Sequence, residues 1–443
     1  MNSQTIYGHH ALEWDRTRLK WSLASLQSGA RETGGGNLYD DGVFSIGGEH
    51  IGWTGELRTE PDRYISEEFY KKMNSGKVST GDVLLVKDGA TIGKLALVKS
   101  VPFGRAAINE HVFILRANQS TDPAFLFYFL QSAYGQQQIQ LYVKGSAQPG
   151  LNSQFINYVH WKVPAQKSQK HIVDFLDRET VRIDTLIEKK ERQIDLLQEK
   201  RGALISHAVT KGLNPNVKMK DSGVEWLGEI PEHWGVAAFR RFITRIEQGW
   251  SPQAEQRIAE EDEWAVLKVG AVYKGSFRIE EQKALPKDLD PNVKYEVQEG
   301  DLLLTRGNTP ELVADACIVP RVRRRLMLSD LHYRLVLNED KCLRPFACYW
   351  LISHQGRIQI QSDAHGTSNS MVKVSQSQIR SWVITCPPLD EQKDIINQLD
   401  IECAKIAGLI KKIEHSINLL QEYRMAVITA AVTGWIDVRK EVA

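Results

Sequence analysis

The chain has 443 residues, of which 42% are hydrophobic and 25% are charged, and its 56 basic and 55 acidic residues leave a formal charge of +1. This length allows two or three domains, each with its own buried core. No segment approaches the roughly 18 consecutive apolar residues that a membrane-spanning helix needs, which excludes a helical membrane protein. Because a protein that binds DNA alone is usually basic overall, a DNA binder with this charge must use local patches or a partner's help.

The cysteines and the first residues bear on where the protein works. Residues 1–5 are polar and lack the apolar core of a secretory signal. The cysteines lie in the second half of the chain without the CxxC spacing of a structural zinc site. We therefore expect a cytoplasmic protein with reduced thiols and no bound metal. The five cysteines are Cys317, Cys342, Cys348, Cys386 and Cys403.

Residues 1–165 predict a first globular domain in which strands and helices are mixed. It opens with a lead-in that contains Trp14 and Trp21. The composition and periodicity of the following segments predict alternating loops, strands and one amphipathic helix. In chain order these are a polar loop at 28–37, a strand at 43–51, a β-rich run with a glycine turn at 81–94, a strand at 111–116, a helix at 124–132, a polar loop at 144–152 and a strand that ends in Pro164.

Residues 166–212 predict a single long helix. Apolar side chains recur at heptad spacing from Val173 to Ala208 with no proline inside, which indicates a helix of about 40 residues. Because one face of this helix is apolar along its whole length, another element must cover it.

Residues 213–388 predict a second globular domain with the same elements in the same order, and residues 389–443 predict a second long helix. Residues 169–210 align with residues 392–433 without a gap, and about half of the positions are identical. The globular parts align more weakly, through the order of their elements and through runs such as GDVLL and GDLLL. We therefore predict a mixed α/β fold with a pseudo-two-fold internal repeat.

Polar residues within the apolar seams favour an antiparallel pairing of the two helices inside one chain. In a parallel homodimer Arg201 would meet Arg201, and Arg424 would meet Arg424. In an antiparallel coiled coil Arg201 falls near Cys403 and Arg424 near Thr180, where small neighbours leave room for each stem to reach outward. The predicted residues of the helix-pair interface are Leu176, Ile183, Ile187, Ile194, Leu197, Leu399, Ile406, Ile410, Ile417 and Leu420.

Two variable globular domains, each followed by a similar long helix, resemble the specificity subunit of a type I restriction-modification enzyme. The lead-in DSGVEWLGEIPEHW at 221–234, the GDVLL and GDLLL runs, the GSA and GTS loops, and the helix segments LLQEKR and LLQEYR are similar to that family. The resemblance covers nearly the whole chain. The order of these short motifs, repeated twice, is more specific than any one of them.

The resemblance implies that residues 1–165 and 213–388 are target recognition domains, each of which reads one half of an asymmetric bipartite site on double-stranded DNA. The helices would set the spacing and dock two methyltransferase subunits, and a motor and nuclease subunit would join such a complex afterwards. The chain itself would bind no cofactor, because the S-adenosylmethionine used for adenine methylation belongs to the methyltransferase partner. Two readers at a fixed separation suit two major-groove segments roughly 34 Å apart.

The residues expected to contact DNA lie on polar loops of both domains. Arg and Lys side chains suit guanine, Asn and Gln suit adenine, and Ser and Thr suit several base edges. The alternative for each single residue is a turn former or a solvated polar group. The predicted DNA-binding residues are Ser28, Arg31, Lys87, Asp88, Thr91, Lys94, Lys144, Ser146, Gln148, Trp250, Ser251, Arg306, Asn308, Thr309, His365, Thr367 and Asn369.

No enzyme motif accompanies these loops: the chain has no P-loop, GxSxG, HExxH or glycine-rich cofactor fingerprint. We therefore expect a non-catalytic subunit. Two weaker alternatives are a nuclease site that uses Glu110 and Asp330, and a metal at His111 or His332, which sit at comparable places but lack further ligands at the right spacing. The alternative class of protein is a coiled-coil scaffold or adaptor of another nucleic-acid defence complex.

Overall fold

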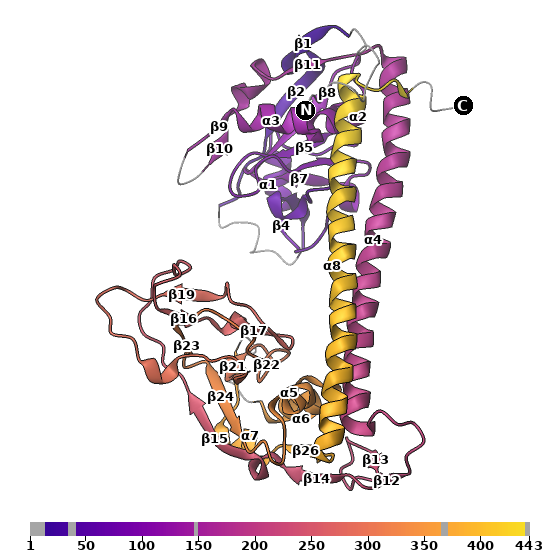
Figure 1. Cartoon of the computed structure of the whole chain (residues 1–443). Helices are drawn as coiled ribbons and strands as arrows, with labels where there is room; N and C mark the ends of the chain where they lie inside the picture. Colours follow the sequence, from indigo (N-terminus) through magenta and orange to yellow (C-terminus); the bar gives the residue numbers. More distant parts are fainter. Residues whose placement is uncertain (1–13, 34–40, 146–148, 365–370, 439–443) are drawn as a thin grey trace, which may run out of the picture. The chain divides into compact units, whose positions relative to one another are not determined.

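The structure is a computed structural model that describes residues 14–33, 41–145, 149–364 and 371–438 (Figure 1). The chain forms two compact units, residues Met1–Lys190 with Glu414–Ala443 and residues Glu191–Ile413. The boundary passes through both long helices. Each unit therefore holds one globular domain together with one half of each helix.

The globular domain of the first unit is built on a four-stranded antiparallel sheet in the order β2-β8-β5-β6. A three-stranded sheet, β4-β3-β7, lies beside it and includes the parallel pair β3 and β7. The elements are β1 (Arg16–Arg18), β2 (Leu23–Ser28), β3 (Val43–Ile46), β4 (Tyr64–Ile65), α1 (Glu67–Lys72), β5 (Val83–Val86), β6 (Leu95–Leu97), β7 (Ala106–Ile108), β8 (Val112–Ala117), α2 (Pro123–Gln131), α3 (Ala133–Gln140), β9 (Val143–Lys144), β10 (Gly150–Leu151) and β11 (His160–Lys162).

The central sheet is buried on both faces because side chains along a strand point alternately to either side. On β5, Val83 and Leu85 belong to the core that contains the residues of α2. The alternate residues Leu84 and Val86 belong to a second core with β3 and β7. The GDVLL run is thus a strand enclosed between a helical layer and a second sheet.

The second unit repeats this arrangement. Its four-stranded sheet has the order β15-β24-β20-β22, and its three-stranded sheet, β19-β16-β23, again contains one parallel pair, β16 and β23. The elements are β12 (Met219–Asp221), β13 (Glu229–Pro231), β14 (Gly235–Ala238), β15 (Ile243–Gln248), β16 (Ala265–Leu267), β17 (Val272–Tyr273), β18 (Ser276–Phe277), β19 (Gln282–Ala284), β20 (Leu302–Thr305), β21 (Gly307–Asn308), β22 (Ala316–Ile318), β23 (Leu326–Met327), β24 (His332–Leu337), α5 (Arg344–Ile352), α6 (His354–Asp363), β25 (Val372–Lys373), α7 (Gln376–Ser381) and β26 (Val383–Cys386). The prediction of a mixed α/β repeat is confirmed.

The short helices of each domain join at a serine that ends one helix and caps the next. Ser132 accepts a hydrogen bond from the amide of Gly135 at 3.0 Å, and Ser353 accepts one from the amide of Gly356 at 3.1 Å. A Cβ at Gly135 would lie 2.1 Å from the carbonyl oxygen of Phe129. Only glycine therefore fits where the two helices turn.

The two long helices pair in antiparallel fashion. Their bounds are Gln166–Lys211 for α4, with 46 residues, and Leu389–Thr433 for α8, with 45 residues, so each exceeds the length of about 40 residues that the apolar repeat indicated. In the first unit, residues 172–176 of α4 share a core with residues 428–432 of α8. In the second unit, residues 204–209 of α4 share a core with residues 395–403 of α8. The start of each helix thus packs against the end of the other, as predicted. Neither helix, nor any other within the described residues, could cross a membrane.

The predicted interface residues divide into two groups by exposure. The buried residues are Leu176, Ile183, Leu399, Ile406 and Ile417. Half-buried are Ile187, Ile194, Leu197, Ile410 and Leu420. The helix pair is therefore covered best where the globular domains also pack on it.

The arginines in the seam do more than reach outward. Arg424 is only 8% exposed. Its Nε donates to Asp184 at 2.9 Å and its Nη2 donates to the carbonyl of Thr54 at 3.2 Å. The expectation that its stem reaches toward solvent is wrong, because a carboxylate and a carbonyl of the protein replace water. Arg201, its counterpart in the other copy, is half-buried and donates to a backbone carbonyl of the second globular domain at 3.2 Å.

Each globular domain is also tied to the helix that follows it by a repeated tyrosine–aspartate bond. The hydroxyl of Tyr128 donates to Asp177 at 2.6 Å, and that of Tyr349 donates to Asp400 at 2.5 Å. Burial, followed by the neighbouring carboxylate, raises the pKa of both tyrosines. Both hydroxyls therefore stay protonated donors, which fixes each domain on its helix.

Candidate nucleic-acid interface

In the first domain, the predicted residues gather around the turn that follows β5. The amide of Lys87 donates to the carbonyl of His111 at 2.9 Å, and the carbonyl of Lys87 accepts from the amide of Leu151 at 2.8 Å. The loop before β8 and the strand β10 therefore flank this turn on its two sides. Ser28 lies at the end of β2, opposite Phe113 of β8.

A chain of charged side chains joins three of the predicted residues. The Arg31 guanidinium lies 3.6 Å from Glu110, and Asp88 lies 3.4 Å from His111 and 3.7 Å from Lys87. Glu110 lies 3.3 Å from His111 and so completes the link. Glu110 and His111 were not among the predicted DNA-binding residues. They were missed because they lie far from Lys87 in the sequence. Only the pairing of β5 with β8 brings them beside the turn.

The far end of the same turn carries a feature that the sequence did not reveal. The Nζ of Lys94 lies 5.6 Å from the centre of the Trp53 ring, and Trp53 is 62% exposed. An exposed aromatic ring beside a cation can stack on a base or pack against a backbone. Thr91 lies in this turn and is half-buried, and Lys144 on β9 is exposed. Ser146 and Gln148 lie outside the described residues.

In the second domain, the same pair of backbone hydrogen bonds holds the turn that follows β20, and we call this pair the backbone frame. The amide of Arg306 donates to the carbonyl of Leu331 at 2.7 Å, and the carbonyl of Arg306 accepts from the amide of Val374 at 2.9 Å. Beside it, the hydroxyl of Ser251 donates to the carboxylate of Asp330 and accepts from the amide of Asp330 at 3.1 Å. Ser251 and Asp330 occupy the places of Arg31 and Glu110. One frame therefore carries different side chains in the two domains.

The remaining predicted residues of the second domain lie around this frame. The amide of Trp250 donates to the carbonyl of Leu328 at 3.0 Å. Asn308 lies on β21, opposite Val372 of β25, and its side chain accepts from the amide of Thr309 at 2.9 Å. His365, Thr367 and Asn369 are among the residues that the structure does not describe.

The aromatic and cationic pair beside the first turn also has a counterpart. The Arg278 guanidinium lies 3.7 Å from the centre of the Tyr273 ring, and Tyr273 directly precedes Lys274 as Trp53 directly precedes Thr54. Both domains thus place an aromatic ring under a cation next to the carbonyl that the seam arginine reaches.

The two histidines of the alternating strands do not occupy equivalent positions. The strand register matches His111 to Leu331 and Val112 to His332. His332 is fully buried, its Nδ1 lies 2.8 Å from the hydroxyl of Ser329, and burial lowers its pKa to about 4. The comparison of these histidines from sequence is therefore wrong by one residue. Across the described ranges no three His, Cys, Asp or Glu side chains form a group that could hold a metal ion.

Comparisons with known proteins agree with this two-domain arrangement. A family model for the type I restriction modification DNA specificity domain matches residues 47–196. The chain is 31% identical over 204 residues to the type I restriction enzyme EcoEI specificity subunit of Escherichia coli, with 46% of this chain and 34% of that subunit covered. This match spans about a third of the EcoEI subunit's length.

A second relative and a solved structure extend the likeness over most of the chain. The MjaVIII specificity subunit of Methanocaldococcus jannaschii is 23% identical over 383 residues, with 85% of this chain and 84% of that subunit covered. A chain of a type I R-M system, solved to describe complex assembly and conformational transition, has the same fold with a TM-score of 0.68 at 15% identity, and 97% of this chain and 100% of that chain are covered.

Proposed function

Because the chain belongs to the DNA specificity subunits of type I restriction-modification enzymes, we propose that each globular domain reads one half of an asymmetric bipartite site on double-stranded DNA. The observation that carries this proposal is the repeated frame around Lys87 and Arg306. The same pair of backbone hydrogen bonds holds both turns, whereas the side chains on them differ. A constant frame with variable donors and acceptors suits two readers of different bases.

The long helices would dock two copies of one methyltransferase subunit. Leu196 and Leu419 occupy the same position in the two helix copies, and each is 49% exposed. An apolar side chain exposed at matching places supports docking of the same partner twice. The partner would carry S-adenosylmethionine and methylate adenine, and it would supply much of the phosphate neutralisation that a chain of charge +1 does not. A motor and nuclease subunit would join this complex.

The proposal is tested by co-expressing the chain with an adenine methyltransferase subunit of a type I system and sequencing the methylated DNA. We expect one bipartite motif with a fixed gap. Exchange of residues 1–165 for those of another specificity subunit should change one half of the motif and leave the other half intact. A scaffold or adaptor would give no modified motif, and either that result or a continuous palindrome would contradict the proposal.

Two single substitutions sharpen this test. Lys87→Ala should relax one half of the motif and Arg306→Ala the other, each by about 1–3 kcal/mol of discrimination if the side chain contacts a base. Lys99→Ala is the control, because Lys99 is an exposed lysine of the same domain away from the turn. Equal weakening at every site without a change in the motif would assign these residues to phosphate contacts instead.

A further inference from the structure

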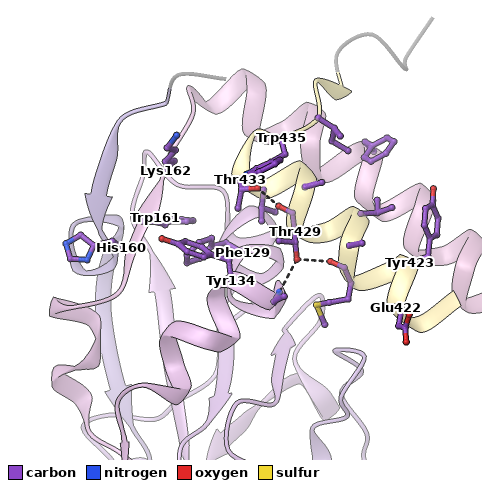
Figure 2. Close-up of a pocket in the computed structure, with 18 of the residues that line it drawn as sticks. Phe129, Tyr134, His160, Trp161, Lys162, Glu422, Tyr423, Thr429, Thr433 and Trp435 are labelled. Atoms are coloured by element: carbon purple, nitrogen blue, oxygen red, sulfur yellow. Dashed lines mark hydrogen bonds between the residues drawn. The ribbon is translucent and has the colours of Figure 1, made fainter. Parts of the chain in front are cut away.

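An open apolar groove lies between the first globular domain and the last turns of α8 (Figure 2). Its volume is about 1160 Å³, larger than the roughly 300–1,000 Å³ of an ordinary small-molecule site. Phe129 and Trp161 pack with ring centres 4.8 Å apart at its base and are each 1% exposed. Tyr134 and Trp435 at its rim are 40% and 64% exposed. A groove of this size with two exposed aromatic side chains suits an apolar peptide segment.

The hydroxyl groups on the α8 side of the groove already have partners. Thr429 donates to the carbonyl of Met425 at 2.7 Å and accepts from the amide of Ala133 at 3.1 Å. Thr433 donates to the carbonyl of Thr429 at 2.6 Å. Figure 2 shows these bonds as dashed lines along the helix. Because these hydroxyls are satisfied, the wall favours an apolar occupant over a polar one.

The second unit shows what covers the matching surface there. Residues 222–234, which lead from α4 into the second domain, contribute Val224, Trp226, Leu227 and Ile230 to the core around the end of α4. The ring centre of Trp226 lies 6.4 Å from that of Trp350, the residue that corresponds to Phe129. Leu227 and Ile230 are 4% and 1% exposed. The lead-in of the second domain therefore fills its own groove.

The first residues of the first domain match this lead-in. With the offset that the strand registers give, residues 1–14 align with residues 221–234, so that Trp14 matches Trp234 and Gly8 matches Gly228. Trp14, the first described residue, packs against the first core. Residues 1–13 themselves lie outside the described part of the chain.

We propose that residues 1–13 of the same chain dock in this groove, with Ile6 and Tyr7 in the places that Trp226 and Leu227 occupy in the second unit. Gly212 and Gly434, with φ angles of 75° and 76°, end α4 and α8 in the same way, so Trp435 lines the groove just beyond the matched helix ends. This docking closes the apolar end of the helix pair and does not depend on DNA binding.

Site-specific photo-crosslinking in the full chain tests this proposal. A benzophenone amino acid at position 7 should crosslink to peptides within 129–134 or 423–436, mapped by mass spectrometry. The same probe at position 5 is the matched control, because the counterpart of Thr5 is the exposed Glu225. We expect crosslinks into the groove to be several-fold more frequent from position 7 than from position 5, and independent of protein concentration.

A second measurement keeps the test independent of the probe. Tyr7→Asp should speed amide hydrogen exchange in α3 and in residues 429–436 by several-fold, whereas Thr5→Asp should leave it unchanged. Equal crosslinking from both positions would overturn the proposal. Crosslinks mainly between two copies of the chain, or crosslinks into the groove that appear only with the methyltransferase subunit present, would overturn it too, because each assigns the groove to another occupant.

Discussion

The ion pair between Arg424 and Asp184 makes an asymmetric prediction about stability. The Arg424 side chain is 10% exposed and the Asp184 side chain is 43% exposed, so only the arginine depends on its partner for solvation. Breaking a fully buried pair by removing one member costs about 3–5 kcal/mol. With Asp184 half in water, we expect Asp184→Ala to cost roughly 2 kcal/mol, because it leaves the guanidinium with only the Thr54 carbonyl.

Removal of the arginine should cost less than removal of its partner. Arg424→Met keeps an apolar stem in the seam and leaves Asp184 free to be hydrated, so we expect a loss of about 1 kcal/mol or less. The double variant should resemble Arg424→Met alone. Urea unfolding of the four proteins gives the coupling energy directly. The pair of Glu402 and Lys405 is the control, because Lys405 is 63% exposed and Glu402→Ala should leave stability nearly unchanged.

An Asp184→Ala variant that is no less stable than Arg424→Met would contradict this expectation. That result would mean that water reaches the guanidinium once the carboxylate is gone. The second helix copy offers a natural comparison, because the position that matches Asp184 is Ala407 and the half-buried Arg201 has no carboxylate partner there. Arg201→Met should therefore cost no more than Arg424→Met in the same assay.

Three further predictions concern single buried groups. Burial lowers the pKa of His332 to about 4 from an ordinary 6.5, so the stability that the neutral ring contributes is complete above pH 6.5 and is lost as the pH falls toward 4. Between pH 7 and pH 4 the free energy of unfolding from urea titrations should fall by roughly 3 kcal/mol more for the parent chain than for His332→Gln. Gly135→Ala should destabilise the protein by more than about 2 kcal/mol in thermal unfolding, because its Cβ would lie 2.1 Å from a backbone carbonyl oxygen. Gly202→Ala is the control and should stabilise α4 by about 0.5–1 kcal/mol, because its Cβ would have nothing within 4 Å. Tyr349→Phe removes the hydrogen bond to Asp400 and should lower the free energy of unfolding in urea by about 1–2 kcal/mol. An unchanged urea midpoint would contradict this and would mean that water replaces the hydroxyl.

The long helices were predictable because their signal is local. Heptad spacing and the absence of proline indicate a helix without reference to the rest of the chain, and the positions of Arg201 and Arg424 favoured the antiparallel pairing that the cores confirm. The predicted segments 166–212 and 389–443 contain the whole of α4 and α8, which both continue beyond the apolar repeat. The order of elements in the two domains was predictable for a related reason, because one copy supported the interpretation of the other.

The candidate interface depended on contacts between distant strands. Arg31, Glu110 and Asp88 come together because β2, β8 and β5 are neighbours in one sheet, and no local pattern encodes that order. The comparison of His111 with His332 failed by a single position for the same reason, since only the pairing of β24 with β20 sets the register. Trp53 and Lys94 likewise meet only in the folded domain.

The sequence by itself determined the internal repeat, the two long helices and their direction, because repetition and periodicity are properties of neighbouring residues. Tertiary structure alone decided which side chains share a surface, how Arg424 is satisfied in the seam, and that an apolar groove lies beside the end of α8. Those features arise from long-range sheet pairing and helix packing, in which burial and hydrogen-bond partners come from residues far apart in the chain.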